Sequence, residues 1–170
     1  MKRGKYGKIY YLWEKISMSV RKSDFYNFIP MDIKDLNKIY NLELESYDYP
    51  WTKEILRDCI LYKYDSFSVF FNENLVGYVI AKITYPETHI LNLTVEKNFR
   101  KKGIGKSLIE LIISDARLRN SENIILEVRV DNIEAQSLYK KLNFQIIGIR
   151  KDYYESEDGR EDAYVLNLDL

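Results

Sequence analysis

Apolar and polar residues alternate over some stretches of this chain and recur with a helical period over others. Alternation predicts strands at 25–29, 66–71, 75–85, 88–96, 123–130, 144–152 and 161–169. Apolar residues three or four apart predict helices from 32 to 47, from 52 onward, over 104–119 and over 132–142. The order β-α-α-β-β-β-α-β-α-β-β predicts a mixed α/β (α+β) domain with antiparallel meanders.

Capping and turn residues set the expected boundaries. Asp32 and Thr52 are typical N-caps, and residues 49–51 separate the two helices because the residue before Pro avoids the α region. A hairpin turn is expected at 72–74 and a polar loop at 155–160. The inner face of the second helix is expected to hold Ile55, Leu56, Cys59 and Ile60.

The segment from Arg100 to Ser107 connects an expected strand to an expected helix. It contains three adjacent cations and two glycines, Gly103 and Gly105. Glycine lets the backbone approach a ligand closely, and the first-turn N–H groups of a helix attract anions. Neighbouring positive charges add Coulomb attraction. The segment therefore predicts a binding site for a ligand that carries phosphate.

Two familiar phosphate loops do not fit this segment. A Walker loop has four residues between its glycines, whereas a single residue separates Gly103 from Gly105. A dinucleotide loop has a third glycine, and here Leu108 follows. What remains is Arg-x-x-Gly-x-Gly at a strand-to-helix turn. Taken alone, it is also compatible with a helix start that happens to contain two glycines.

Blocks on either side of this turn follow one another in a family-specific order. They are His89–Val95, Arg100–Gly105, Leu126–Arg129 with Asn132, Leu138–Phe144, Tyr153-Tyr154 and Glu161–Tyr164. Together they resemble the GNAT superfamily of acetyl-CoA-dependent N-acetyltransferases, and most of all its RimI-type and archaeal protein N-terminal acetyltransferases. The resemblance covers roughly residues 25–170. It implies the GNAT fold, a mixed central sheet of about seven strands with helices on both faces.

The resemblance also implies acetyl-CoA as co-substrate and no metal. The pyrophosphate is expected on the backbone of the turn, and the pantetheine along a strand that splays from its neighbour in this family. A free N–H of that strand would also polarise the acetyl carbonyl. The residues expected to bind acetyl-CoA are Leu93, Thr94, Val95, Arg100, Lys101, Lys102, Gly103, Ile104, Gly105, Lys106, Ser107, Asn132, Tyr139 and Lys141. Core positions for Leu93 and Val95 are compatible with this, and helix capping alone is the alternative for Asn132.

Acetyl transfer needs a base for the amine and an acid for the departing thiolate. The resemblance implies Tyr139 as general acid, since a phenol with a pKa near 10 can protonate a thiolate, and Glu127 as general base. A buried core tyrosine and a structural Glu127–Arg129 ion pair are the alternatives. His89, the only histidine, is a second candidate proton acceptor. An ordinary strand-end histidine and a metal ligand remain the alternatives for it.

Substrate recognition is expected from the loop between the first two helices and from the segment before the last strand. The resemblance implies that the first residues of a peptide are buried between them. The residues expected to bind substrate are Glu43, Glu45, Tyr47, Tyr49, Trp51, Tyr153 and Tyr154. Of these, Glu43 and Glu45 are candidate partners for the α-ammonium group or alternative bases. The segment Leu44–Trp51 departs from the archaeal Leu-Pro-Glu-Asn-Tyr pattern and ends in Pro-Trp, as in the RimI type.

Charge divides the chain into two parts. The 170 residues have a formal net charge of zero, but residues 1–22 hold seven Lys and Arg against one Glu. This predicts a basic aromatic extension at 1–22 and an acetyltransferase domain at 23–170. The extension is expected either to contact RNA or the ribosome, or to pack its aromatic residues on the domain. One cysteine and no membrane-length apolar run predict a cytoplasmic protein without a membrane partner. A monomer or homodimer is expected.

These features predict transfer of the acetyl group of acetyl-CoA to the α-amino group of protein or peptide N-termini, by direct attack in a ternary complex. Cys59 lies outside the motifs and is not expected to act as a nucleophile. One alternative is a GNAT enzyme that acts on a small amine or a lysine side chain. The other is a non-catalytic module that binds acyl-CoA or the ribosome.

Overall fold

The computed structural model describes residues 26–170, and the expected extension at 1–22 lies outside them. The strands are β1 Tyr26–Pro30, β2 Asp65–Phe71, β3 Asn74–Ile83, β4 Glu87–Val95, β5 Asn123–Arg129, β6 Gln145–Ser156 and β7 Gly159–Asp169. The helices are α2 Leu36–Ser46, α3 Lys53–Leu61, α4 Ile104–Leu118 and α5 Ile133–Lys141, with the 3₁₀ turns η1 Ile33–Asp35 and η2 Lys97–Phe99. The expected order of strands and helices is confirmed. Within residues 26–170, no helix is long and apolar enough to cross a membrane.

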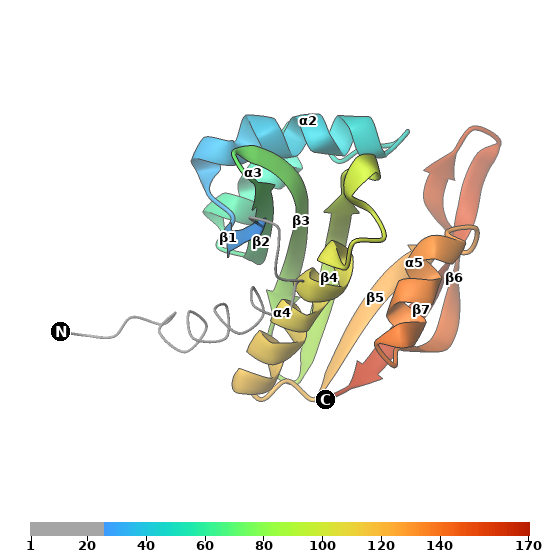
Figure 1. The fold of residues 1–170 in the computed structure, drawn as a ribbon. Helices are drawn as coiled ribbons and strands as arrows, with labels where there is room; N and C mark the ends of the chain where they lie inside the picture. Colours follow the sequence, from blue (N-terminus) through green and yellow to red (C-terminus); the bar gives the residue numbers. More distant parts are fainter. Residues whose placement is uncertain (1–25) are drawn as a thin grey trace.

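One mixed sheet organises the domain, with strand order β1-β2-β3-β4-β5-β7-β6. Every neighbouring pair is antiparallel except β4 and β5, which run parallel. Helices α2 and α3 cover one face, and α4 and α5 cover the other (Figure 1). The expected fold, a seven-stranded mixed sheet with helices on both faces, is confirmed.

Alternation along β3 sends side chains to two different cores. Tyr78 and Ile80 pack with the apolar residues of α2 and α3, while Val79 and Ala81 pack on the α4 side. All four are fully buried. Because successive side chains of a strand point to opposite faces, a strand covered on both sides needs apolar residues at every position.

Two expected local features differ from the structure. Ile55 was expected on the inner face of α3 but is 44% exposed, because the buried stripe follows Leu56 and Cys59, three residues apart. The loop expected at 155–160 is only a tight turn, since β6 continues to Ser156 and β7 begins at Gly159. The left-handed φ of Gly159 closes this turn.

A bulge in β4 opens the sheet. Ile90 pairs with Ala81 and Asn92 with Ile80, so Leu91 is left without a partner on β3. Pairing between β4 and β5 ends at the same place, at Ile90. A bulge bends its strand and increases its twist. Beyond Leu91, β4 therefore diverges from β5, which confirms the expected splay (Figure 1).

Candidate active site

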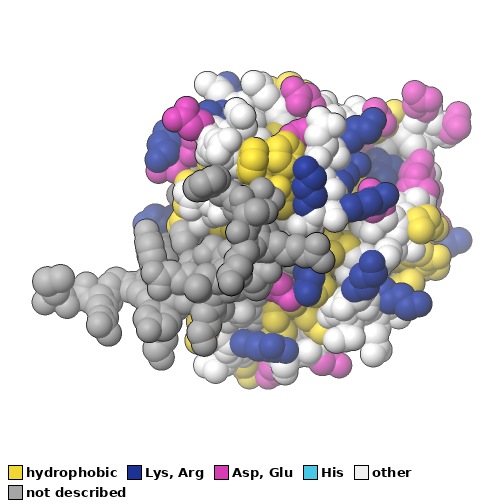
Figure 2. Space-filling model, in the orientation of Figure 1, with side chains coloured by type: hydrophobic (Ala, Val, Ile, Leu, Met, Phe, Trp, Pro, Cys, Tyr) yellow, Lys and Arg dark blue, Asp and Glu magenta, His cyan; other side chains and the backbone are white. Residues whose placement is uncertain are grey.

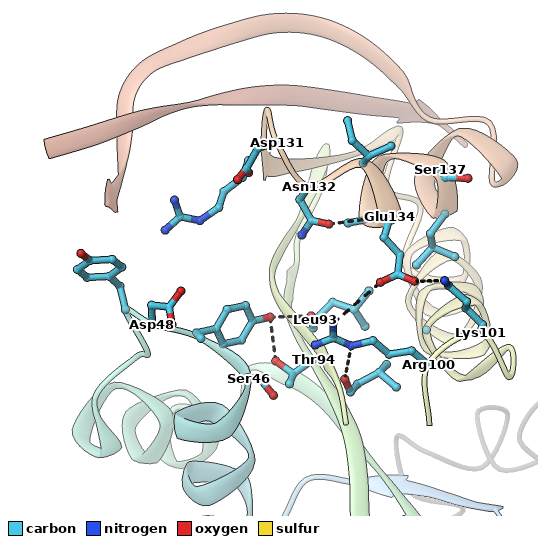
Figure 3. A pocket seen from close by; sticks show the side chains of 18 of the residues that line it. Ser46, Asp48, Leu93, Thr94, Arg100, Lys101, Asp131, Asn132, Glu134 and Ser137 are labelled. Atoms are coloured by element: carbon cyan, nitrogen blue, oxygen red, sulfur yellow. Dashed lines mark hydrogen bonds and ion pairs between the residues drawn. The ribbon is translucent and has the colours of Figure 1, made fainter. Parts of the chain in front are cut away.

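A pocket of about 1640 Å³ opens where β4 and β5 diverge (Figure 3). Its walls come from the end of α2, the end of β4, the start of α4, the start of α5 and the tip of the β6–β7 hairpin. Predicted site residues that line it are Tyr47, Tyr49, Leu93, Thr94, Val95, Arg100, Lys101, Gly103, Ile104, Gly105, Lys106, Asn132 and Lys141.

The end of β4 presents its backbone to this pocket. The Leu93 carbonyl accepts a hydrogen bond from the Tyr47 hydroxyl at 3.0 Å, and the Val95 carbonyl accepts one from Arg100 Nε at 3.1 Å. Neither carbonyl is paired with β5. The N–H and C=O of one strand residue point to the same side, so the amides of Leu93 and Val95 also face the open side. An extended ligand could pair with them as an added strand would.

The start of α4 forms the anion turn predicted from the sequence. Gly103 occupies the N-cap position with a left-handed φ of 89°. The N–H groups of the first helical turn, from Ile104 on, have no intrahelical acceptor. Gly105 brings this turn close to its neighbours, because a Cβ there would lie 3.2 Å from Leu138 Cδ2 and 3.7 Å from Val95 Cγ2.

Replacing Gly103 with Ala is expected to destabilise the domain and weaken its anion site. A left-handed backbone costs a residue with a Cβ about 1–2 kcal/mol. The free energy of unfolding from urea titrations should fall by that amount. The calorimetric affinity for coenzyme A should fall too, because relieving the strain turns the helical N–H groups away.

Gly148→Ala is the matched control for Gly103→Ala. Gly148 lacks a left-handed φ, and among residues 26–170 no atom beyond Gly148 and its two chain neighbours lies within 4 Å of the position that its Cβ would take. It should change neither stability nor coenzyme A affinity. Equal affinities for coenzyme A in the two variants would contradict the role given to Gly103.

The cations of the turn differ in their surroundings. Lys101 lies 3.4 Å and Arg100 4.0 Å from the carboxylate of Glu134, and all three line the pocket (Figure 3). Lys102 instead stacks over Phe99 at 4.8 Å and does not line the pocket. Ser107 is buried behind the turn. Of the three adjacent cations, Arg100 and Lys101 are therefore the two whose side chains a phosphate would reach, in competition with Glu134.

His89, Glu127 and Arg150 form an ionic cluster across three strands. His89 Nε2 lies 2.8 Å from Glu127 Oε2, and Arg150 Nη1 donates to Glu127 Oε1 at 2.7 Å. The side chain of Glu127 is 8% exposed and that of His89 is 34% exposed. The alternative of a Glu127–Arg129 pair is wrong, since Arg129 pairs with Glu161. Neither Glu127 nor His89 lines the pocket itself.

Contacts within this cluster shift the pKa values of His89 and Glu127. The hydrogen bond to Glu127 raises the pKa of His89 above its ordinary value, against a smaller opposite effect of burial. Burial alone would raise the pKa of Glu127, but hydrogen bonds from His89 and Arg150 outweigh it, and the pKa is lowered. His89 is therefore the member that changes charge closest to neutral pH.

Three tyrosines lie near this cluster or the pocket, of which Tyr47 lines the pocket and Tyr139 and Tyr154 do not. Tyr139 is buried against Phe144, and burial raises its pKa, helped by the nearby phenols of Tyr47 and Tyr154. The Tyr154 hydroxyl donates to the Glu127 carbonyl at 3.2 Å. Burial raises the pKa of the Tyr47 hydroxyl to about 12. These phenols keep their protons at neutral pH and can donate them.

Several residues predicted to bind substrate lie elsewhere. Glu43 is 1% exposed, and its carboxylate accepts from the Trp51 amide at 2.9 Å, from Asn92 Nδ2 at 3.3 Å and from the Tyr78 hydroxyl. Glu45 lines a separate pocket of about 270 Å³. In the structure Glu43 therefore fixes the loop after α2, and its role toward a substrate amine stays a prediction.

The aromatic residues expected at the substrate site have different surroundings. Trp51 packs on the α2–α3 core. The ring of Tyr153 lies against that of Tyr154, with centroids 4.8 Å apart, and under the Arg150 guanidinium. No group of three or more metal-ligating side chains occurs among residues 26–170.

The sequence pattern did not indicate Arg150 and gave Arg129 no role of its own. The pairing of β6 with β7 shifts register near Ile147 and again between Arg150 and Tyr154. Alternation along the sequence therefore does not predict which residues of β7 lie opposite those of β6. Without that register, nothing in the sequence placed Arg150 beside Glu127. The alternation of Glu127 and Arg129 on β5 was the one available signal, and it did place both on one face.

Known proteins resemble this chain over most of its length. Residues 36–144 match the acetyltransferase (GNAT) family. The [ribosomal protein bS18]-alanine N-acetyltransferase of Haemophilus ducreyi is 32% identical over 138 residues, which are 81% of this chain and 95% of the relative. The protein of that name from Escherichia coli K12 is 29% identical over 140 residues, 82% of this chain and 95% of the relative.

A solved structure agrees with the sequence relatives. The crystal structure of the ribosomal-protein-S18-alanine N-acetyltransferase from Escherichia coli superposes with a TM-score of 0.80 at 27% identity. The match covers 86% of this chain and 94% of that one.

Proposed function

The chain belongs to the acetyltransferase (GNAT) family, and we propose that it transfers the acetyl group of acetyl-CoA to the α-amino group of protein N-termini. The observation that carries this proposal is the pocket where the end of β4, whose backbone is not paired with β5, meets the anion turn of α4. It provides one site for an extended amide chain and one for phosphate. The bacterial relatives, named for acetylating the alanine of ribosomal protein bS18, support a protein N-terminus of that kind as substrate.

The proposed place of acetyl-CoA follows from these two parts. The pyrophosphate would bind the first-turn amides of α4, with Arg100, Lys101 and Lys106 as cations. The pantetheine would pair with Leu93 and Val95. Asn132, which caps α5 by accepting from the Ala135 amide at 3.0 Å, keeps its Nδ2 for the same ligand. Bound in this way, acetyl-CoA would supply an activated thioester at the place where β4 and β5 diverge.

The chain's own groups supply the proton transfers. The Nε2 of His89 bonds to Glu127, which leaves Nδ1 as the acceptor for the amine proton, through water because the pair lies behind the pocket wall. Glu127 orients the ring and stabilises its charged form. Tyr139 donates its proton to the departing thiolate. The free amide at Leu93 or Val95 stabilises the developing oxyanion.

The peptide would enter between the α2–α3 loop and the β6–β7 hairpin. Tyr47 and Tyr49 line the first wall, and Ser156 to Asp158 line the second. We infer that Tyr153 and Tyr154 support the second wall, since they precede its tip on β6. The basic extension at 1–22, as a part separate from the domain at 23–170, is proposed to dock on the ribosome.

Mass spectrometry on short peptides tests the proposed function. Peptides beginning with Ala, Ser, Met-Leu and Met-Glu are compared with the same peptides blocked at the N-terminus, with lysine and with polyamines. Acetylation of the free N-terminus alone is expected. Acetylation of blocked peptides or of polyamines would favour a different amine substrate. Saturable coenzyme A binding without any product would favour the non-catalytic module.

A further inference from the structure

The tip of the β6–β7 hairpin extends past the end of β5, the strand that pairs with β7. Pairing of β7 with β5 ends at Arg129 opposite Ala163, while β6 and β7 pair on to Ser156 and Gly159. We call residues 154–161 the arm. Figure 1 shows it projecting beyond the end of β5, and Figure 2 shows acidic side chains at its tip. Part of the arm lines the pocket at the proposed peptide entrance.

Backbone pairing alone does not fix the direction of the arm. A two-stranded ribbon is marginally stable by itself. In addition, β6 is interrupted just before the arm, since residues 151–153 all lie opposite Asp162. The Asp162 carboxylate accepts from the Asp152 amide at 3.0 Å, and Arg160 donates to the carbonyls of Asp152 and Tyr153. These bonds shape the bulge but do not connect the arm to β5.

Arg129 provides most of that connection, beside the Tyr154 hydroxyl, which donates to the Glu127 carbonyl on β5. Arg129 is the last residue of β5 and also lines the pocket. Its Nη1 donates to Glu161 Oε2 at 2.5 Å, and its Nη2 donates to the Glu155 carbonyl at 2.7 Å. The guanidinium lies 4.6 Å from the centre of the Tyr154 ring. One planar side chain therefore contacts both strands of the arm and its first aromatic residue, a geometry that Lys does not reproduce.

We propose that Arg129 is a positioning residue that holds the arm over the peptide site, and so sets peptide affinity without taking part in acetyl transfer. The inference rests on the proposed function, because only a peptide substrate would need a wall at this entrance. The arm also lies close to the proposed proton-transfer residues, since the hydroxyl of Tyr154 in the arm donates to the backbone carbonyl of Glu127. The contacts proposed for acetyl-CoA come from the end of β4 and the starts of α4 and α5 rather than from the arm, so its affinity should not change.

The test compares Arg129→Gln and Arg129→Lys with the wild type. In Arg129→Gln we expect faster amide exchange over residues 154–161 and a peptide KM raised about tenfold, with kcat and the calorimetric Kd for acetyl-CoA within about twofold. Arg129→Lys should be intermediate, because it keeps a charge for Glu161 but cannot also reach the Glu155 carbonyl and stack on Tyr154. Arg117→Gln is the control, since Arg117 is an exposed cation on α4 and its loss removes the same charge.

The outcomes separate this inference from the proposed function. Unchanged exchange of the arm in Arg129→Gln, or an unchanged peptide KM, would overturn the positioning role. If Arg129→Gln does not fold, Glu161→Gln removes only the ion pair and must show the same faster exchange in smaller degree, or the inference fails. If the wild type acetylates no peptide, the proposed function fails, while the exchange measurement still decides whether Arg129 holds the arm.

Discussion

Replacing Tyr139 with Phe is expected to lower kcat about a hundredfold while the peptide KM stays near its wild-type value. The substitution removes only the hydroxyl that would protonate the thiolate. Among residues 26–170 that hydroxyl has no hydrogen-bond partner, and the ring remains packed on Phe144. Burial raises the pKa of Tyr139, so the phenol is protonated at every working pH. The measurement is steady-state kinetics with the best peptide of the panel.

The control for Tyr139→Phe is Tyr62→Phe. Tyr62 is 74% exposed at the end of α3 and far along the chain from the motifs, so losing its hydroxyl should change nothing. Melting temperatures of both variants should match the wild type. A Tyr139→Phe enzyme with wild-type turnover would show that Tyr139 is a core tyrosine and that the leaving thiolate takes its proton elsewhere.

Replacing Glu127 with Gln should lower the plateau of kcat/KM about a hundredfold and move the acid limb of the pH profile to lower pH. In the wild type, the hydrogen bond that His89 donates to the Glu127 carboxylate raises the pKa of His89 above 6.5. The neutral ring is the base, so activity is lost as the pH falls through this raised pKa. Gln can offer only a neutral acceptor, so the negative charge that raises the pKa of His89 is lost while the burial that lowers it remains. The ring of the variant is therefore neutral at lower pH, but it is a weaker and less well oriented base.

The direction of this shift distinguishes the two candidate bases. The pKa of Glu127 is lowered from 4.5, so a carboxylate acting alone would be ionised throughout the range from pH 6 to 8. Its loss would then reduce the rate without moving the acid limb. His89→Gln, measured beside it, should remove the limb altogether. Glu122→Gln is the control, because Glu122 is an exposed acid just before β5.

Local sequence signals predicted the elements of this fold well. Side chains at Thr52 and Asn132 cap α3 and α5 as their residue types predict. Spacing of apolar residues located each strand and helix in the right order. The anion turn was also predicted from the sequence, because its signal is local: Gly103 adopts the left-handed conformation that favours glycine. These features depend on residues within a few positions of one another, which a sequence shows directly.

The sequence by itself determined the order of strands and helices, the turn before α4 and the residue types available for catalysis. Only the tertiary structure decided that β4 bulges at Leu91 and leaves β5, that Glu43 is buried and that Glu127 bonds to His89 and Arg150. Register and burial depend on contacts between segments far apart in the chain. A shift of one residue in pairing turns a side chain to the other face, and no local pattern records such a shift.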